Sequence, residues 1–96
     1  MIWLHGYGDT ARGYQDLFYG WQILGNAKVI LLTAPMRTGQ MGEPINSWFD
    51  YKIYENDQRG IDLNHLLESR QMVEKVLETE IKILGDSTKI LLGGFS

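Results

Sequence analysis

Three short apolar runs, at residues 2–4, 29–32 and 90–92, alternate along this chain with two stretches of helical periodicity, and the third predicts a strand over residues 88–92. Each run is followed within three residues by glycine or proline, which is typical of strands buried on both faces of a parallel sheet. In the order strand, helix, strand, helix, strand, right-handed crossovers bring the parallel strands together and put the helices on the faces of the sheet. The sequence therefore predicts an α/β fold, with three parallel strands and two flanking helices (β-α-β-α-β).

The two helical stretches differ in length and in how clearly they are bounded. In residues 13–24, apolar side chains recur at spacings of three and four and Gly25 marks the end, although Gly20 in the interior costs about 1 kcal/mol relative to alanine. The second stretch begins after Asp62, a suitable N-cap, and ends at Gly85. Its apolar positions share one face of a long helix: Leu63, Leu66, Leu67, Val73, Leu77, Ile81 and Leu84.

The roughly twenty residues after Pro35 show neither helical nor strand periodicity. Connections of this length without secondary structure are uncommon in a small domain and usually have a function. The stretch contains Ser47-Trp48-Phe49-Asp50, whose aromatic rings we expect to pack while Asp50 hydrogen-bonds nearby backbone. Trp48 could also shape a substrate pocket, and the sequence alone leaves both roles open.

Composition limits the chain to one domain, residues 1–96, and excludes several classes of function. The net charge is −3 and the basic residues are scattered, so nucleic acid is not an expected partner. The chain has no cysteine, which excludes disulfides and thiolate metal sites. Its first apolar stretch is too short for a signal peptide or a membrane span, so we expect a cytoplasmic protein without stable membrane insertion.

The last apolar run leads into Gly93-Gly94-Phe95-Ser96. A serine two residues after a glycine, between a buried strand and a helix, is typical of the nucleophile elbow Gly-x-Ser-x-Gly, in which a strained turn exposes the hydroxyl. Gly94 supplies the small neighbour that the turn needs. We expect Ser96 to be a catalytic nucleophile, while an ordinary turn at a strand end is the alternative that these residues leave open.

The first apolar run leads into a glycine-rich loop, His5-Gly6-Tyr7-Gly8-Asp9-Thr10. In α/β-hydrolases one N–H group of the oxyanion hole comes from a loop after an earlier strand, which often contains His-Gly. Gly6 and Gly8 would let the backbone approach a reacting carbonyl, and the Tyr7 N–H would be the donor. A tight turn without function is the alternative for this loop. For His5 we expect a structural role in which the ring hydrogen-bonds the backbone.

Neither histidine is expected to act as a general base for Ser96. The chain order in α/β-hydrolases is Ser, then Asp or Glu, then His, whereas His5 and His65 both precede Ser96. Asp50 precedes it too, which argues against a role as the triad acid, and His65 is expected on the surface of its helix. No carboxylates stand at metal-ligand spacing from the histidines, and the glycine loop lacks a phosphate-binding pattern, so we expect neither a metal nor a cofactor.

Taken together, these motifs resemble the phospholipase/carboxylesterase family, which includes the acyl-protein thioesterases. The resemblance rests on LHGYGDT, TAPMR, SWFD and ILLGGFS, at residues 4–10, 33–37, 47–50 and 90–96. It implies an α/β-hydrolase that cleaves thioesters of palmitoylated proteins, small carboxylic esters or lysophospholipids without a cofactor. Carried over to this chain, it makes Ser96 the nucleophile and Tyr7 the backbone donor of the oxyanion hole; His5, Gly6, Gly8, Asp9 and Gly94 belong to the same motifs.

The chain also departs from the family pattern. Members continue after the serine with Gln-Gly-Gly and a helix, and the triad acid and histidine follow later. We therefore expect the N-terminal part of one hydrolase domain, inactive by itself and with apolar surface exposed. A non-catalytic binding or regulatory derivative of the same fold is the second hypothesis, and a generic parallel α/β domain, flavodoxin-like for instance, is the third. Oligomeric state and acyl preference are not encoded in recognisable motifs.

Overall fold

A small parallel sheet lies at the centre of the computed structural model, which describes residues 1–96. Strand β1 (Ile2–Leu4) is in the middle, with β2 (Ile30–Leu32) on one side and β7 (Leu92–Gly94) on the other. Both pairings are parallel, as the apolar runs predict. The predicted fold class and the three-stranded parallel sheet are thus confirmed.

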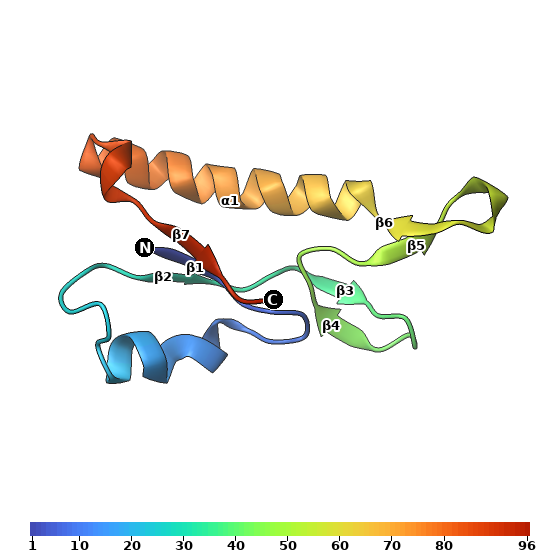
Figure 1. Ribbon diagram of the computed structural model, residues 1–96, viewed down its shortest axis with the longest axis horizontal. Coiled ribbons are helices and arrows are strands. Elements are labelled where there is room, and N and C mark those ends of the chain that lie inside the picture. The colour runs from blue at the N-terminus through green and yellow to red at the C-terminus, as the bar shows by residue number, and fades with distance from the viewer.

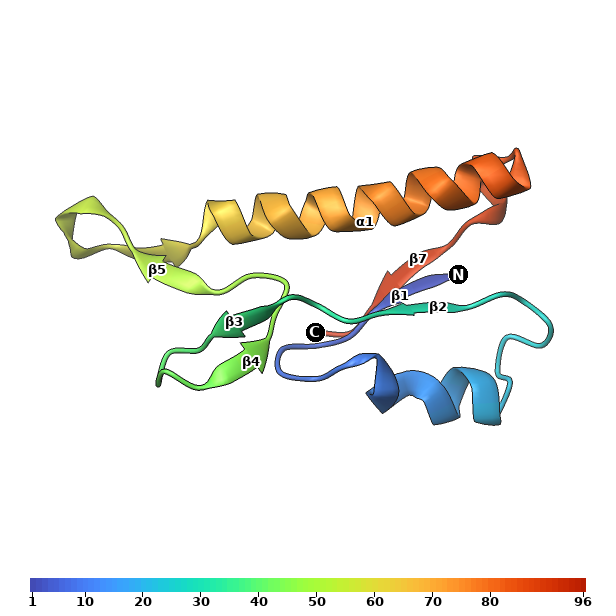
Figure 2. The ribbon, with the colours of Figure 1, turned by 180° about the vertical axis from the view of Figure 1, so that it is seen from behind.

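Helical segments cover the two faces of this sheet (Figures 1 and 2). The long helix α1 (Leu63–Leu84) crosses one face, and two short segments, η1 (Ala11–Tyr14) and η2 (Asp16–Gly20), lie on the other. On that second face the Trp3 ring packs against two aromatic rings, with centroids 5.4 Å from Tyr14 and 5.2 Å from Phe18. These aromatic contacts attach the short helical segments to the sheet.

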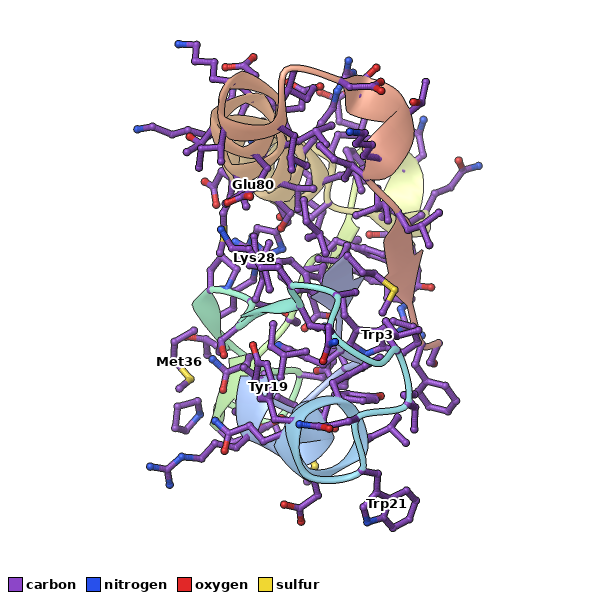
Figure 3. All side chains as sticks on the ribbon, turned by 90° about the vertical axis from the view of Figure 1, so that its left-hand side faces the viewer. Trp3, Tyr19, Trp21, Lys28, Met36 and Glu80 are labelled. Atoms are coloured by element: carbon purple, nitrogen blue, oxygen red, sulfur yellow. The ribbon has the colours of Figure 1, made fainter.

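Helix α1 is bounded as the sequence predicts. The Asp62 carboxylate accepts hydrogen bonds from the backbone N–H groups of Asn64 and His65, at 3.0 and 3.3 Å. At the other end Gly85 has a φ of 69°, the left-handed conformation in which glycine commonly ends a helix. Near that end Glu80 forms an ion pair with Lys28 at 3.1 Å, which joins the helix to the segment before β2 (Figure 3).

The Asp62 cap predicts a pH-dependent stability for helix α1. Partial burial would raise the pKa of Asp62, but the N-cap hydrogen bonds and the charges of His65 and Lys52 outweigh it and hold the pKa below the ordinary 3.8. The carboxylate therefore stabilises the fold above about pH 4, and this contribution is lost as the pH falls through the lowered pKa.

We expect Asp62→Asn, which can still cap the helix, to flatten the loss of stability between about pH 5 and pH 2. The measurement is the urea midpoint of the full-length gene product followed by circular dichroism across that range. Glu78→Gln removes an exposed carboxylate that has no partner and should leave the wild-type pH dependence intact. An Asp62→Asn variant with the wild-type acid dependence would contradict this role of the cap.

The first helical stretch is shorter than predicted. The sequence predicts one helix over residues 13–24, whereas the structure has the separate segments η1 and η2 and ends them at Gly20. Trp21 is 76% exposed and points away from the sheet (Figure 3). Glycine is a poor helix former, and only Phe18 of this stretch is buried, so packing does not extend the helix beyond Gly20.

The last strand also lies further along the chain than predicted. Instead of residues 88–92, β7 comprises Leu92–Gly94, and a 3₁₀ turn occupies Ser87–Lys89. The turn forms because the Asp86 side chain accepts a hydrogen bond from the Thr88 N–H at 2.9 Å. The strand then uses its glycines for close contact, since a Cβ on Gly93 would lie 2.9 Å from the Trp3 ring.

The prediction of a connection without secondary structure after Pro35 is wrong. Two antiparallel hairpins fill it, β3 (Met36–Thr38) with β4 (Pro44–Asn46) and β5 (Tyr51–Ile53) with β6 (Arg59–Ile61). The tip of the second hairpin is a 3₁₀ turn, η3 (Glu55–Asp57). These strands are three residues long and mostly exposed, so they leave no alternation of apolar and polar residues to detect.

The buried core is small for a chain of this length. Only eight of the 96 residues are buried, and the apolar ones are Ile2, Phe18, Val29 and Ala34. Strand β2 pairs on one side alone and is only half-buried, although its apolar run predicts a strand covered on both faces. None of the helices has the length and apolar composition needed to cross a membrane.

Candidate active site

The loops that leave β1 and β7 run side by side because the two strands are parallel and adjacent. Leu4 is paired with Gly94, and the Phe95 N–H donates to the Leu4 carbonyl at 3.1 Å. A Cβ on Gly6 would lie 3.3 Å from the Phe95 carbonyl oxygen and 3.5 Å from Ser96 Cβ. The fold therefore brings the two predicted motifs, from opposite ends of the sequence, into direct contact.

Ser96 adopts a backbone conformation that serine rarely takes. Its φ is 60°, in the left-handed region. Just before it, Gly94 allows the chain to pass close to β1, since a Cβ there would lie 3.2 Å from the Leu4 carbonyl oxygen. A strained serine shortly after a small residue is what the predicted nucleophile elbow requires at this position.

The loop after β1 presents a free backbone donor beside Ser96. The Gly8 N–H donates to the Asn46 carbonyl at 2.9 Å, and the Asp9 N–H donates to the Gly6 carbonyl at 3.2 Å. The Tyr7 N–H between them has no acceptor in the chain. Gly8 is needed at its position because its φ is 79° and a Cβ would lie 3.3 Å from Ile45. The loop is thus held rigidly, with one amide left unoccupied.

The one acidic residue of this loop, Asp9, turns away from Ser96. Its carboxylate accepts a hydrogen bond from the Thr10 N–H at 2.8 Å, just before η1. Asp9 is exposed and lines neither pocket next to Ser96. Its contacts are those of a residue that shapes the turn.

His5 is a buried structural side chain. Its exposed fraction is 2%, its Nε2 accepts a hydrogen bond from the Ala34 N–H at 2.9 Å, and its Nδ1 is 2.7 Å from the Gly6 carbonyl oxygen. An accepting Nε2 and a donating Nδ1 correspond to the neutral ring with its proton on Nδ1. Both nitrogens are therefore occupied, and His5 links the glycine loop to the end of β2.

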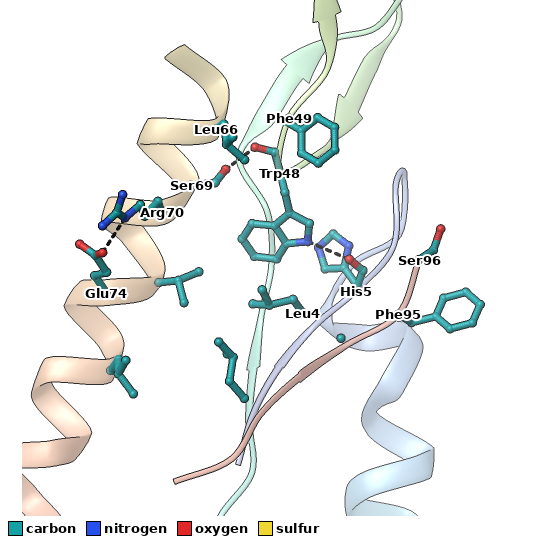
Figure 4. Close-up of a pocket in the computed structure, with 14 residues that line it drawn as sticks. Leu4, His5, Trp48, Phe49, Leu66, Ser69, Arg70, Glu74, Phe95 and Ser96 are labelled. Carbon is teal, nitrogen blue, oxygen red and sulfur yellow. Dashed lines mark hydrogen bonds and ion pairs between the residues drawn. The ribbon is translucent and has the colours of Figure 1, made fainter. Parts of the chain in front are cut away.

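Trp48 forms one wall of the site and is fixed by His5 (Figure 4). The indole Nε1–H donates to the His5 carbonyl at 2.7 Å, and the two ring centroids are 5.2 Å apart. Trp48 lines both pockets that reach Ser96. The sequence leaves packing and substrate contact open as roles for this residue, and its position allows both.

Arg37 holds the Trp48 segment against helix α1, a role that sequence reasoning missed. Its guanidinium donates to the carbonyls of Ser47 at 3.0 Å, Trp48 at 3.4 Å and His65 at 3.3 Å. The Ser69 hydroxyl also donates to the Trp48 carbonyl (Figure 4). Arg37 is only 8% exposed, so these carbonyls have little access to water. The only signal in the sequence was a single arginine two residues after Pro35, shortly after an apolar strand.

We expect Arg37→Met to destabilise the full-length gene product by about 3 kcal/mol, because several buried acceptors lose their donor. Arg37→Lys should recover only part of this loss, since one ammonium group cannot reproduce the planar fork. Urea unfolding measures both variants. The matched control is Arg70→Met, which removes an exposed arginine paired with Glu74 and should leave the midpoint close to wild type. Equal stability of the Arg37 and Arg70 variants would contradict the conclusion that Arg37 holds the Trp48 segment against helix α1.

Asp50 is anchored as the sequence predicts, and it also faces the site. Its carboxylate accepts hydrogen bonds from the Tyr51 N–H at 2.7 Å, Gln40 Nε2 at 3.0 Å and the Tyr7 hydroxyl at 3.4 Å. Partial burial raises the pKa of Tyr7, and the negative charges of Asp50 and Glu43 raise it further.

His65 does more than the surface role expected for it. Its Nδ1 accepts a hydrogen bond from the Asp50 N–H at 3.2 Å, and its Nε2 is 3.5 Å from the Asp62 carboxylate. Both ring nitrogens of His65 have partners, as do those of His5, and neither ring forms a hydrogen bond with Ser96. The histidines of this chain therefore support the scaffold of the site.

Two pockets open beside Ser96. One, of about 230 Å³, lies between the glycine loop and the Trp48 segment. The other, of about 500 Å³, lies between helix α1 and β7 and is largely apolar, with Leu66, Val73, Leu77 and Leu92 in its lining. No three histidine, aspartate or glutamate side chains are grouped so that they could hold a metal ion.

Comparisons with known proteins agree on one family. The family model described as Phospholipase/Carboxylesterase matches residues 1–96. The chain is 30% identical to acyl-protein thioesterase 1 of Schizosaccharomyces pombe over 98 residues, which is 100% of this chain and 43% of that protein. It is 31% identical to acyl-protein thioesterase 1 of Yarrowia lipolytica over 101 residues, and covers 44% of it.

Solved structures show the same likeness. The crystal structure of Zea mays acyl-protein thioesterase 2 matches 99% of this chain with a TM-score of 0.67 and 30% identity, over 39% of that chain. Arabidopsis thaliana SOBER1 matches 99% of this chain with a TM-score of 0.77 and 24% identity, over 48% of that chain, which is a likeness of fold. The chain thus spans less than half the length of the relatives it matches.

Proposed function

The chain belongs to the phospholipase/carboxylesterase family, and from that premise we propose that it is the nucleophile-bearing part of a serine hydrolase that cleaves acyl thioesters or carboxylic esters. In this proposal residues 1–96 are the N-terminal part of a single α/β-hydrolase domain. The observation that carries it is the contact between Ser96, in its left-handed turn, and the Gly6-Tyr7 loop with its free amide.

In the proposed mechanism the Ser96 hydroxyl attacks the carbonyl carbon of the substrate. Negative charge then develops on the carbonyl oxygen, and the Tyr7 N–H stabilises it together with the N–H of the residue after the serine. Collapse of this intermediate releases the thiol or alcohol and leaves an acyl-enzyme, which water hydrolyses to the free acid. The general base and its orienting acid are supplied from outside these 96 residues, and no cofactor takes part.

The substrate class is inferred from the relatives and from the pockets. The relatives are named acyl-protein thioesterases, so an acylated protein or a small ester or lysophospholipid is the proposed substrate. Trp48 lines both pockets at Ser96 and is the proposed wall of the substrate site. A cytoplasmic location agrees with the sequence-based expectation and is part of the proposal.

Covalent labelling tests this function most directly. A fluorophosphonate probe reacts with a serine that is activated by a base and an oxyanion hole, so the native full-length gene product should be labelled on Ser96. Peptide mass spectrometry then locates the adduct. Heat-denatured protein should not react, and the exposed Ser87 serves as an internal control because it has no activating partner. Labelling of neither serine, or of both equally, would overturn the proposal.

A further inference from the structure

The smaller pocket at Ser96 combines aromatic walls with one buried carboxylate. Its lining includes the aromatic residues Tyr7, Trp48, Phe49 and Tyr51, together with Asp50. Ser96 lines the same pocket, so a group bound here would lie close to the reacting carbonyl.

The buried Asp50 carboxylate forms no ion pair within the chain. Asp50 is only 4% exposed, yet none of the ion pairs in the structure includes it. Its hydrogen-bond donors are neutral: a backbone amide, the Gln40 amide and the Tyr7 hydroxyl. Burial of an unpaired carboxylate is unfavourable, and a cation in the adjoining pocket would relieve that cost.

The charged groups around this segment do not supply that cation. His65 accepts the Asp50 N–H on Nδ1 and turns its Nε2 toward the Asp62 carboxylate at 3.5 Å, so its ring is not directed at the Asp50 carboxylate. Arg59 lies over the Tyr51 ring and Lys52 lies over the Tyr54 ring, so both cations are engaged on the β5–β6 hairpin. Glu43 adds negative charge near Tyr7. The pocket therefore combines one buried carboxylate with four aromatic residues in its lining.

We propose that this pocket binds an ammonium group, quaternary or primary, which the ester substrate carries a few bonds from its carbonyl. This rests on the proposed function, because Ser96 is taken as the nucleophile. An organic ammonium suits the site better than a small hydrated metal ion. Aromatic rings attract a weakly hydrated cation but cannot replace the water ligands of a hard one, and only one carboxylate is present.

A pair of thioesters that differ only in charge tests the proposal. Butyrylthiocholine carries a trimethylammonium group, and S-(3,3-dimethylbutyl) thiobutyrate replaces its nitrogen by carbon at nearly the same size. With the full-length gene product, we expect kcat/KM to favour the charged substrate by about tenfold. Asp50→Asn should reduce this preference by about tenfold, and the ratio cancels any loss that is common to both substrates. Glu78→Gln removes an equal charge elsewhere on the surface and should keep the wild-type ratio.

Two outcomes would overturn the ammonium site: an equal rate for both thioesters in the wild-type protein, or the same preference in Asp50→Asn. Hydrolysis of the neutral thioester that depends on Ser96 tests the proposed function separately, so the two proposals can fail independently. Saturation-transfer NMR with tetramethylammonium chloride needs no turnover and covers the case of an Asp50 variant that does not fold. Transfer from the aromatic protons of the wild-type protein to the methyl groups supports the site, and its absence overturns it.

Discussion

Full-length gene product that carries Ser96→Ala is expected to lose ester and thioester hydrolysis by roughly 10⁶-fold in kcat. Alanine removes the atom that forms the acyl-enzyme, and what remains is the much smaller acceleration from substrate binding and the oxyanion hole. The geometry that makes Ser96 special stays in place, because the strained turn and the contact with Gly6 belong to the backbone. Turnover of p-nitrophenyl butyrate and of a palmitoylated peptide thioester measures the effect.

The control for this substitution is Ser87→Ala, which changes an exposed serine in the turn before β7 and should retain wild-type turnover. Thermal unfolding of both variants should remain near wild type, since neither hydroxyl is buried. Substantial turnover by Ser96→Ala would show that another group performs the attack.

A polypeptide of these 96 residues alone is expected to show no esterase activity above the level of its own Ser96→Ala variant. Loss of the catalytic base costs roughly 10⁶-fold in serine hydrolases of known mechanism. Within this chain both histidines have other partners: His5 binds Ala34 and Gly6, and His65 binds Asp50 and Asp62. Neither can take the proton from Ser96 without breaking these contacts. The measurement is p-nitrophenyl ester turnover at high protein concentration.

The same polypeptide should also be poorly soluble as a monomer. The groove between α1 and β7 exposes Leu66, Leu92 and Phe95, and β7 has an unpaired edge. We propose that further polypeptide pairs with the edge of β7 in the full-length gene product and leaves the pocket at Ser96 accessible. The fragment should then bind the dye ANS and self-associate, while the full-length product does neither. A cooperative monomeric melt of the fragment, or ester turnover that Ser96→Ala abolishes, would contradict these expectations.

Much of the fold could be predicted because the signals are local. The apolar runs of β1 and β2 become strands close to their predicted bounds, and helix α1 begins after Asp62 and ends before Gly85 as the caps indicate. The errors fall where tertiary contacts override local preference. Packing of Gly93 on Trp3 shifts the last strand, and the exposed hairpins after Pro35 leave no periodic pattern.

The site follows the same division. The glycine loop and the Gly-x-Ser turn are visible as motifs because their strained or tightly packed backbone conformations require glycine at fixed positions. The residue types of the sequence therefore reveal them. The hydrogen bonds by which Arg37 and Ser69 hold the Trp48 segment were not visible, since their acceptors are backbone carbonyls, which any residue provides. The lack of an ion-pair partner for buried Asp50 was not visible either, because only the folded structure shows which cations lie near its carboxylate.

The sequence by itself determined the family, the α/β order of elements and the serine that ends the last apolar run. Only the tertiary structure decided that Ser96 contacts Gly6, that both histidines have hydrogen-bond partners of their own, and that Asp50 lines a pocket without an ion-pair partner. The physical reason is the distance along the chain over which each kind of interaction acts. Periodicity, caps and turn chemistry act over a few neighbouring residues, whereas the register of parallel strands joins residues ninety positions apart in one contact, between Ile2 and Leu92.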